Sequence, residues 1–389
     1  MRRNDWWMIL EPFRAEKKNF IRRKIFLIAA YLLLLPAVAY AESPEITAEA
    51  AILIDATTGQ VFYAKNPHQQ RSPASLTKIM TALLALEGGN LDDVVTVSGK
   101  AASFYMGQTI GLHTGEKITL RNLLKAALII SANDSTVAIA EHIGGSEERF
   151  IQMMNAKAVL LGALHTRYAN TNGYTQANHY STAYDLALIT RYALKKPQFR
   201  KFVSTRDDVV EWVGQPRKQT VHNTNRLLSD GYLGIYGIKT GSTASAGNCL
   251  IAAAGRSDRE LLTVVLHSQN RYLDTIKLLD YGFEQIESIY LCRKGEFIRS
   301  CLVQEGVFPW VMIVANEDMK VDILRDELAG LKRKVSLDDF FVAPVQTGQK
   351  LGQVVFYLRE EELGRVDLVA AQTVPRKRWV TKIRERVFG

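Results

Sequence analysis

The sequence predicts an α+β protein in which an antiparallel sheet covered by helices is followed by a small all-β domain. Strand-like apolar runs lie at the two ends of the first domain, in residues 50–65 and 236–267, while the stretch between them has helical periodicity. After about residue 290 the pattern changes to short alternating strands broken by turns. We therefore expect a first domain over residues 42–288, its end strands meeting in one sheet, and a β-sandwich-like domain over residues 289–373.

The first domain begins with two strand-like runs on either side of Thr57-Thr58-Gly59, which predicts a hairpin. Ser72 followed by Pro73 is a helix start, and helical periodicity continues from there to Glu87, where two glycines end it. The polar segment 131–134 separates two of the helices that follow. The further helices of this region are expected over residues 120–130, 135–143, 147–161 and 182–194.

Strand character then returns in three runs, with a turn over residues 255–259 between the last two. These runs are residues 236–239, 248–254 and 260–267, and a helix is expected after them over residues 272–285. In the second domain, the clearest strands are expected over residues 310–315, 320–324 and 353–358.

The net charge of +9 over 389 residues belongs to the ends of the chain. Residues 1–41 hold eight Lys/Arg and three Asp/Glu, and residues 375–389 hold six Lys/Arg and one Glu. The part between them is close to neutral, so the charge gives no support to nucleic-acid binding.

The N-terminal residues 1–41 have the pattern of a secretory signal peptide. Arg22, Arg23 and Lys24 precede the apolar run 25–38, and Ala39-Tyr40-Ala41 provides a small-residue cleavage site. The apolar run is shorter than the ~20 residues that a spanning helix needs, which favours cleavage after Ala41 over the alternative, an uncleaved anchor.

The C-terminal residues 374–389 predict a basic amphipathic helix that associates with a membrane surface. Pro375 can open such a helix, with Trp379, Ile383 and Val387 on one face and basic residues on the rest. The alternative is a solvated tail, since a helix of about four turns is marginal alone.

Three cysteines are too few for a disulfide scaffold or a metal ribbon. In an exported protein, Cys292 and Cys301 could pair across a short hairpin, whereas Cys249 lies in an apolar strand and is expected to be a buried thiol.

The chemistry-bearing pattern starts with the S-x-x-K motif formed by Ser75 and Lys78 at the start of a predicted helix. Residues three apart on a helix are neighbours, so the lysine can reach the serine hydroxyl. A serine becomes nucleophilic when a base takes its proton, and a lysine can do this once burial or nearby charge lowers its pKa. Alone, such a pair is usually an ordinary feature of a helix surface.

Two further motifs follow in order. Ser131-x-Asn133 lies in a break between helices, where a hydroxyl and an amide can relay a proton and hold a substrate amide. Lys239-Thr240-Gly241 ends a strand and offers a positive charge and a hydroxyl for a carboxylate, with a glycine that allows close approach of a substrate backbone. Taken singly, the first could be a helix cap and the second a strand end.

The ordered set S-x-x-K, S-x-N and K-T-G resembles β-lactamases and penicillin-binding proteins. The chain looks most like the D-alanyl-D-alanine carboxypeptidases among the low-molecular-weight penicillin-binding proteins. Residues 51–59, 131–134, 170–174 and 180–187 share this likeness, which spans the first domain from about residue 45 to 285. The resemblance implies the β-lactamase/penicillin-binding-protein-like fold for that domain.

The resemblance also implies roles for individual residues. Ser75 would be the acylated nucleophile, Lys78 its general base and Ser131 a proton relay. Asn133 would orient the peptide, Lys239 and Thr240 would receive the terminal carboxylate, and Gly241 would let the substrate approach. Backbone N–H groups of Ser75 and Ser242 would form the oxyanion hole. Many members of the family have His where this chain has Ser242, and Arg271 is a candidate second carboxylate contact.

The expected activity is removal of the terminal D-alanine from peptidoglycan stem peptides outside the cytoplasmic membrane, with β-lactams as covalent inhibitors and no metal or organic cofactor. A D,D-endopeptidase uses the same motifs. A β-lactamase is disfavoured because residues 170–176 contain no carboxylate that could activate the deacylating water. A silent wall-binding scaffold is the alternative from another class. No H-E-x-x-H, G-x-S-x-G, Walker loop or G-x-G-x-x-G is present.

Overall fold

A computed structural model describes residues 43–378 of the chain. The predicted signal peptide and residues 379–389 of the predicted C-terminal helix lie outside the described residues. Among residues 43–378, no helix combines the length and apolar character needed to cross a membrane.

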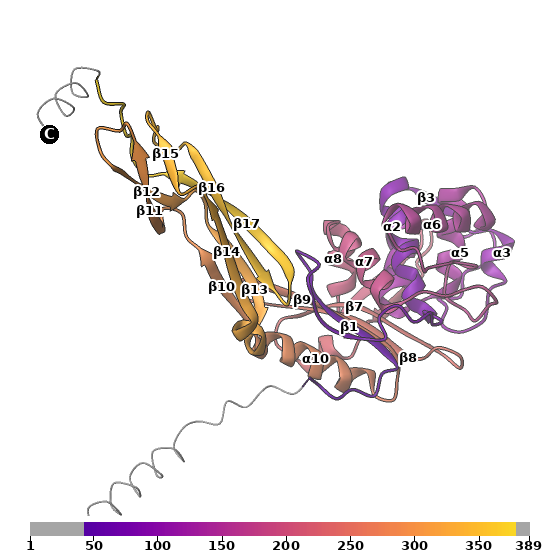
Figure 1. The fold of residues 1–389 in the computed structure, drawn as a ribbon. Coiled ribbons are helices and arrows are strands. Elements are labelled where there is room, and N and C mark those ends of the chain that lie inside the picture. The colour runs from indigo at the N-terminus through magenta and orange to yellow at the C-terminus, as the bar shows by residue number, and fades with distance from the viewer. Residues whose placement is uncertain (1–42, 379–389) are drawn as a thin grey trace, which may run out of the picture. The chain divides into compact units, whose positions relative to one another are not determined.

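The first domain is built on a five-stranded antiparallel sheet with the strand order β2-β1-β9-β8-β7 (Figure 1). Ala50 of the first strand pairs with Leu266 of the ninth, so the two ends of the domain meet in one sheet, as the sequence predicted. The strand expected over residues 236–239 is longer in the structure, where it is β7 and includes the whole K-T-G motif. The strands are β1 (Ala50–Asp55), β2 (Val61–Lys65), β7 (Ile235–Thr243), β8 (Gly247–Arg256) and β9 (Arg259–Ser268).

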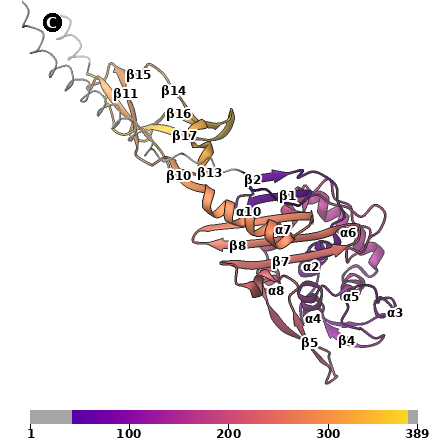
Figure 2. The ribbon, with the colours of Figure 1, turned by 90° about the horizontal axis from the view of Figure 1, so that it is seen from below.

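Helices cover both faces of this sheet (Figure 2). All six residues of β1 are buried, because successive side chains of a strand point to opposite faces. Ile52 and Ile54 join the main core beneath the helical cluster, whereas Leu53 packs with Leu279 of α10 (Arg271–Gln285) on the other face. This explains why β1 is a continuous apolar run and does not alternate with polar residues.

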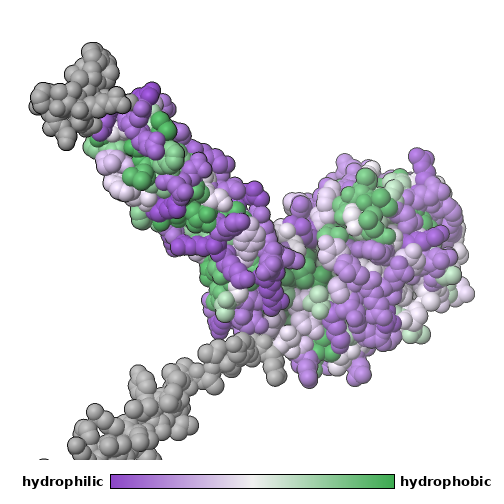
Figure 3. Space-filling view, in the orientation of Figure 1, coloured by the Kyte–Doolittle hydropathy of each residue, from purple (hydrophilic) through white to green (hydrophobic). Residues whose placement is uncertain are grey.

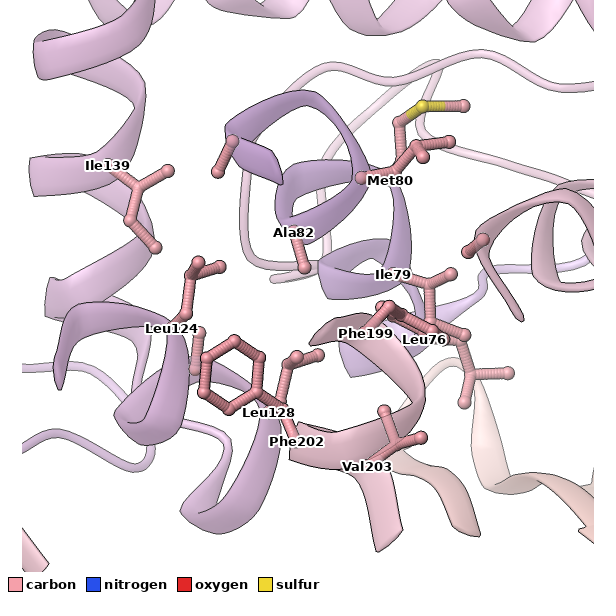
Figure 4. Close-up of a cluster of buried hydrophobic side chains, with 14 of the residues drawn as sticks. Leu76, Ile79, Met80, Ala82, Leu124, Leu128, Ile139, Phe199, Phe202 and Val203 are labelled. Carbon is pink, nitrogen blue, oxygen red and sulfur yellow. The ribbon is translucent and has the colours of Figure 1, made fainter. Parts of the chain in front are cut away.

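The helical cluster packs around α2 (Lys78–Gly88), whose Ile79 and Ala82 lie among side chains of other helices (Figure 4). Leu128 and Phe199 belong to the same buried cluster. The remaining helices of the domain are η1 (Ala74–Thr77), α3 (Gly99–Ala102), α4 (Leu120–Lys125), η2 (Ala126–Ile130), α5 (Asn133–Gly144), α6 (Glu147–Leu160), α7 (Ala183–Leu194), α8 (Pro197–Ser204) and α9 (Leu227–Asp230).

Two element boundaries differ from the sequence prediction at places that matter for the site. The helix expected from Ser72 and Pro73 begins as the 3-10 helix η1 at Ala74, which has a left-handed φ of 47°, and it becomes α-helical at Lys78. The helix expected over residues 120–130 changes from α to π at Ala126, and α5 already begins at Asn133. The break between these helices is therefore shorter than predicted.

Two short hairpins in the helical region were not predicted. They pair β3 (Val94–Thr96) with β4 (Lys117–Thr119) and β5 (Asp207–Glu211) with β6 (Lys218–His222).

The C-terminal part is all β apart from one 3-10 turn, which agrees with the predicted fold class. Six strands form a mixed sheet in the order β14-β16-β17-β12-β11-β15, and β10 pairs with β13. Alternate residues such as Val311 and Ile313 form its separate apolar core. The elements are β10 (Ile286–Cys292), β11 (Phe297–Gln304), β12 (Trp310–Ala315), β13 (Met319–Leu324), η3 (Arg325–Gly330), β14 (Leu331–Leu337), β15 (Phe340–Val342), β16 (Lys350–Leu358) and β17 (Glu361–Ala370).

Two expectations about this part of the chain are corrected. Cys292 and Cys301 are both free and buried in the apolar core, and their Sγ atoms lie near different carbonyl oxygens. The structure therefore gives no disulfide between them. Pro375 does not open a helix, because Val374 and Arg376 form β-bridges to Val345 and Gly306. The β structure thus extends beyond residue 373.

Candidate active site

Ser75 and Lys78 meet where η1 passes into α2. The Nζ atom of Lys78 lies 3.0 Å from Ser75 Oγ, as the spacing of three residues predicted. Lys78 is fully buried, and its Nζ also donates to Asn133 Oδ1 at 2.7 Å and to the carbonyl oxygen of Asn172 at 2.8 Å. Three fixed acceptors thus hold the amine against the serine hydroxyl.

Burial lowers the pKa of Lys78 well below its usual value, because the charged ammonium is removed from water. The positive charge of Lys239 lowers this pKa further, while the carboxylate of Asp134 opposes the change. A lysine with a lowered pKa can be neutral near physiological pH and can then accept the proton of a serine.

Ser131 ends the π-helix η2 with a left-handed backbone, at φ 68° and ψ 31°. A residue other than glycine in this conformation carries backbone strain of about 1–3 kcal/mol, and such residues concentrate at functional sites. Ser131 lines the cleft in front of Ser75. The structure thus places the serine of S-x-N in the same cleft as Ser75.

Asn133 lies one residue inside α5, where its amide is already engaged on both sides. Its Oδ1 accepts from Lys78, and its Nδ2 donates to the carbonyl oxygen of Met106 at 2.8 Å. The sequence analysis assigned this side chain to the substrate amide. In the structure, its hydrogen bonds link the general-base candidate to the loop between α3 and β4.

The K-T-G motif lies on β7, which is an edge strand of the sheet. Lys239 is buried, and burial together with the nearby charge of Arg271 lowers its pKa to about 7. The Oγ1 atoms of Thr240 and Thr224 lie 2.6 Å apart.

Gly241 brings β7 against the turn that carries Ser75. A Cβ atom at this position would lie 3.1 Å from the backbone nitrogen of Ser75 and 3.1 Å from the carbonyl oxygen of Pro73. The sequence analysis attributed this glycine to close approach of a substrate. Its close neighbour in the structure is the protein's own serine turn, on which the position of Ser75 beside β7 depends.

Arg271 is fixed beside the residue that follows K-T-G. Its Nη1 donates to Gly241 O at 2.9 Å, to Ser242 Oγ at 2.8 Å and to Cys249 O at 3.3 Å. This guanidinium therefore adds positive charge to the K-T-G end of the cleft.

These residues surround one cleft of about 620 Å³. Lys78 and Lys239 are buried behind its wall. The other sequence-predicted residues that line it are Ser75, Ser131, Asn133, Thr240, Gly241, Ser242 and Arg271. None of the described residues that line this cleft is Asp or Glu.

Sequence reasoning missed three residues that complete the arrangement: Asn172, Thr224 and His179. The Nδ1 of His179 accepts from the backbone N–H of Ala169 at 3.0 Å, so its Nε2 carries the proton and donates to Thr77 Oγ1 at 2.8 Å. Burial lowers the pKa of His179 to about 4, which keeps the ring neutral. The imidazole thus ties the loop before Asn172 to the helix turn before Lys78.

Comparison with known proteins agrees with this geometry. Residues 37–270 match the family described as D-alanyl-D-alanine carboxypeptidase, and residues 287–376 match the C-terminal domain of penicillin-binding protein 5. The D-alanyl-D-alanine carboxypeptidase DacF of Bacillus subtilis (strain 168) is 35% identical over 351 residues, which cover 88% of this chain and 89% of that protein. DacD of Escherichia coli (strain K12) is 30% identical over 348 residues, which cover 86% of this chain and 88% of that protein.

A solved structure gives the same result. Penicillin-binding protein 5 from Haemophilus influenzae superposes with a TM-score of 0.66 at 30% identity, covering 86% of this chain and 99% of that one. The chain therefore belongs to the D-alanyl-D-alanine carboxypeptidase family of serine peptidases and carries the C-terminal domain of penicillin-binding protein 5.

Proposed function

We propose that the chain removes the terminal D-alanine of peptidoglycan stem peptides through an acyl-enzyme on Ser75. The observation that carries this proposal is the 3.0 Å contact between Ser75 Oγ and the buried, pKa-lowered amine of Lys78. Lys78 takes the hydroxyl proton as Ser75 Oγ bonds to the carbonyl carbon between the two D-alanines. The N–H groups of Ser75 and Ser242 would stabilise the oxyanion.

The C–N bond then breaks, and the departing amine takes a proton through Ser131, so D-alanine leaves. Lys239 and Thr240 would hold its carboxylate, with Arg271 adding positive charge, while Asn133 keeps Lys78 in place and offers its amide edge to the peptide. Water next attacks the ester, its proton passes to the base, and Ser75 is released with its hydroxyl restored. In this scheme the reaction requires no metal or organic cofactor.

Slow deacylation of β-lactams is part of the proposal, so penicillin should inhibit the enzyme. The absence of Asp and Glu among the described residues of the cleft supports it, since rapid hydrolysis by class A β-lactamases uses a Glu. The nearby Glu147 is engaged elsewhere, accepting from Thr171 Oγ1 and pairing with Lys100.

The test is intact-mass analysis after benzylpenicillin treatment, together with D-alanine release from a D-Ala-D-Ala peptide. We expect a stable adduct on Ser75 and release of D-alanine, both lost in Ser75→Ala. An adduct without release of D-alanine would favour a D,D-endopeptidase. Rapid loss of the adduct would favour a β-lactamase, and absence of any adduct would favour the silent scaffold.

We further propose that the enzyme acts outside the cytoplasmic membrane after removal of residues 1–41. The positive n-region, the short apolar run and the A-x-A site support this, as does the position of assembled peptidoglycan outside that membrane. Mature protein from cells should begin at Glu42 by mass analysis, and an intact N-terminus would contradict cleavage. For expression we propose to move the domain limits from 288 and 373 to 285 and 376, because β10 (Ile286–Cys292) and the bridging residues 374–376 pair within the second domain.

Finally, we propose that the C-terminal end lies on an anionic membrane surface. Phe340, Leu302 and Trp310 are directly paired on three adjacent strands and remain 48%, 46% and 52% exposed. The hairpin beyond the Leu302–Trp310 pair bridges to Arg376, so the apolar row lies close to the basic end of the chain. Figure 3 shows apolar surface on this part of the domain.

Truncation after Arg378 tests this surface without removing the β-bridges. Binding to phosphatidylglycerol vesicles should weaken on truncation and weaken again when Leu302 and Trp310 are also changed to Ser. Vesicle binding that neither change affects would refute the proposal.

A further inference from the structure

A second, shallower groove of about 450 Å³ adjoins the cleft at its K-T-G end. The two hollows share Thr224 and Arg271 as walls, so a molecule in one can extend into the other. The groove continues past these shared residues to Arg226 and Tyr272. None of the sequence motifs pointed to it.

Two guanidinium groups in this groove share one aromatic ring. Arg226 lies over the ring of Tyr272 at 4.6 Å from its centroid, and Arg271 lies over it at 5.2 Å. The hydroxyl of Tyr272 donates to the carbonyl oxygen of Thr224 at 3.1 Å, which fixes the ring. The ring therefore holds two positive charges close together at the groove wall.

Neither arginine has a carboxylate partner within residues 43–378. The donors of Arg271 go to neutral oxygens of Gly241, Ser242 and Cys249, and no ion pair of Arg226 occurs in this part of the chain. Elsewhere, Arg200 and Arg217 also stack on aromatic rings, and each is paired with a glutamate. Two unpaired like charges favour an anion between them.

We propose that this groove is a subsite for a leaving-group residue with a second carboxylate, an inference that rests on the proposed function. If the α-carboxylate of the departing residue binds at Thr240, a longer side chain on that residue can reach the groove past Thr224, because Thr224 lies beside Thr240 and lines both hollows. D-Alanine carries only a methyl group and leaves the groove empty. A D-residue with an acidic side chain fills it.

The bond changes are those of the proposed reaction. Ser75 Oγ bonds to the carbonyl carbon, the C–N bond to the acidic residue breaks, and its amine leaves with one proton. Water then hydrolyses the ester. The leaving group is an acidic residue where the proposed reaction has D-alanine, and all other steps are the same. The subsite therefore changes which substrate is preferred, and the reaction needs no additional reactant.

The test compares release of D-glutamate from acyl-D-Ala-D-Glu with release of D-glutamine from acyl-D-Ala-D-Gln. The two leaving groups have the same shape and differ by one charge. We expect kcat/KM to favour the glutamate peptide about fivefold, the size of a partly exposed charge contact. In Arg226→Gln this ratio should fall to about 1, and in Arg226→Lys most of it should return.

Arg256→Gln is the matched control, because Arg256 also stacks on a tyrosine ring but lies outside both hollows. It should keep the wild-type ratio. Equal kcat/KM for the two peptides in the wild type, or a ratio that survives in Arg226→Gln, would overturn the subsite while D-alanine release stands. Failure to release even D-alanine from a D-Ala-D-Ala peptide would overturn the proposed function as well.

Discussion

The side-chain oxygens of Thr224 and Thr240 lie 2.6 Å apart, so one hydroxyl donates to the other. If Thr224 donates, the proton of Thr240 is free to point into the cleft, where a substrate carboxylate would accept it. Thr224 would then act as a positioning residue for the K-T-G threonine.

Thr224→Val removes this donor and keeps the shape of the side chain. We expect KM for a D-Ala-D-Ala peptide to rise about 5- to 10-fold, within the range of one hydrogen bond between neutral groups, with a smaller change in kcat. Thr224→Ser restores the donor and should restore KM. An unchanged KM in the valine variant would show that Thr240 needs no such partner.

Lys78→Met should reduce acylation by benzylpenicillin by about 1000-fold or more, because the proton acceptor of Ser75 is lost. The thermal midpoint should change only modestly, since removal of a buried ionisable group offsets part of the cost of leaving Asn133 Oδ1 and the carbonyl oxygen of Asn172 without this donor. Lys65→Met is the control, as this lysine donates to the carbonyl oxygen of Ile46, far from the cleft lining. Normal acylation in Lys78→Met would require another base.

The pH dependence of kcat/KM should have a basic limb set by Lys239, whose pKa is lowered to about 7. Below that pH the ammonium is charged and attracts the substrate carboxylate, and above it the charge is lost, so kcat/KM should fall. Lys78, whose pKa is lowered by burial, is expected to set the acidic limb, because its protonated form cannot accept the proton of Ser75. In Lys239→Arg, the basic limb should disappear because arginine keeps its charge. A basic limb that persists in this variant would assign it to another group.

Two features of the position next to Ser75 require glycine at residue 173: a left-handed backbone and the lack of space for a Cβ atom. Its φ is +89°, and a Cβ atom there would lie 1.8 Å from the carbonyl oxygen of Ala74. Gly162 has a φ of +79° and open space around it. Gly162→Ala should therefore lower stability by only about 1–2 kcal/mol, through backbone strain, and keep acylation.

Gly173→Ala should additionally displace the turn that carries Ser75 and slow acylation by about 100-fold, since small misplacements in a site are costly. Benzylpenicillin acylation rates and thermal midpoints of both variants provide the comparison. Equal effects of the two changes would mean that contact with Ala74 plays no part.

His179 should make the catalytic domain sensitive to acid. Its pKa in the folded protein is about 4, below the unfolded value of 6.5. The unfolded state therefore binds more protons between these values, so stability is complete above pH 6.5 and is lost as the pH falls toward 4, by at most about 3 kcal/mol.

Thermal midpoints at pH 7.5 and pH 5 test this prediction. In His179→Gln the midpoint at pH 7.5 should fall, because the hydrogen bonds to Thr77 and Ala169 are disturbed, and the difference between the two pH values should shrink. His222→Gln, at an exposed histidine paired with Asp207, should leave the difference unchanged. A wild-type midpoint that does not fall at pH 5 would contradict the prediction.

The sequence predicted those parts of the site that depend on local geometry. Ser75 and Lys78 are three residues apart at the start of a helical segment, so their contact follows from helical spacing alone. Asn172 and Thr224 could not be predicted in this way, because they reach the site from loops. No periodicity in a loop shows which carbonyl or hydroxyl will face a lysine or threonine far away in the sequence.

The boundaries that failed have physical causes of the same kind. Ala126 and its neighbours have ordinary helical composition, and only packing of the helix determines the change to a π-helix before Ser131. Pro375 suits a helix start as well as an extended segment. The pairing of Val374 with Val345 decides between them in this chain.

The pairing of Ala50 with Leu266 also sets an order of events during synthesis. The first hairpin leaves the ribosome long before its partner strand exists, and the turn with Ser75 is also made well before Gly241. A partly made chain thus carries the nucleophile without the wall that holds it in place. Nascent and truncated forms should therefore not react with penicillin. The time at which the covalent label first forms would then report when the sheet is complete.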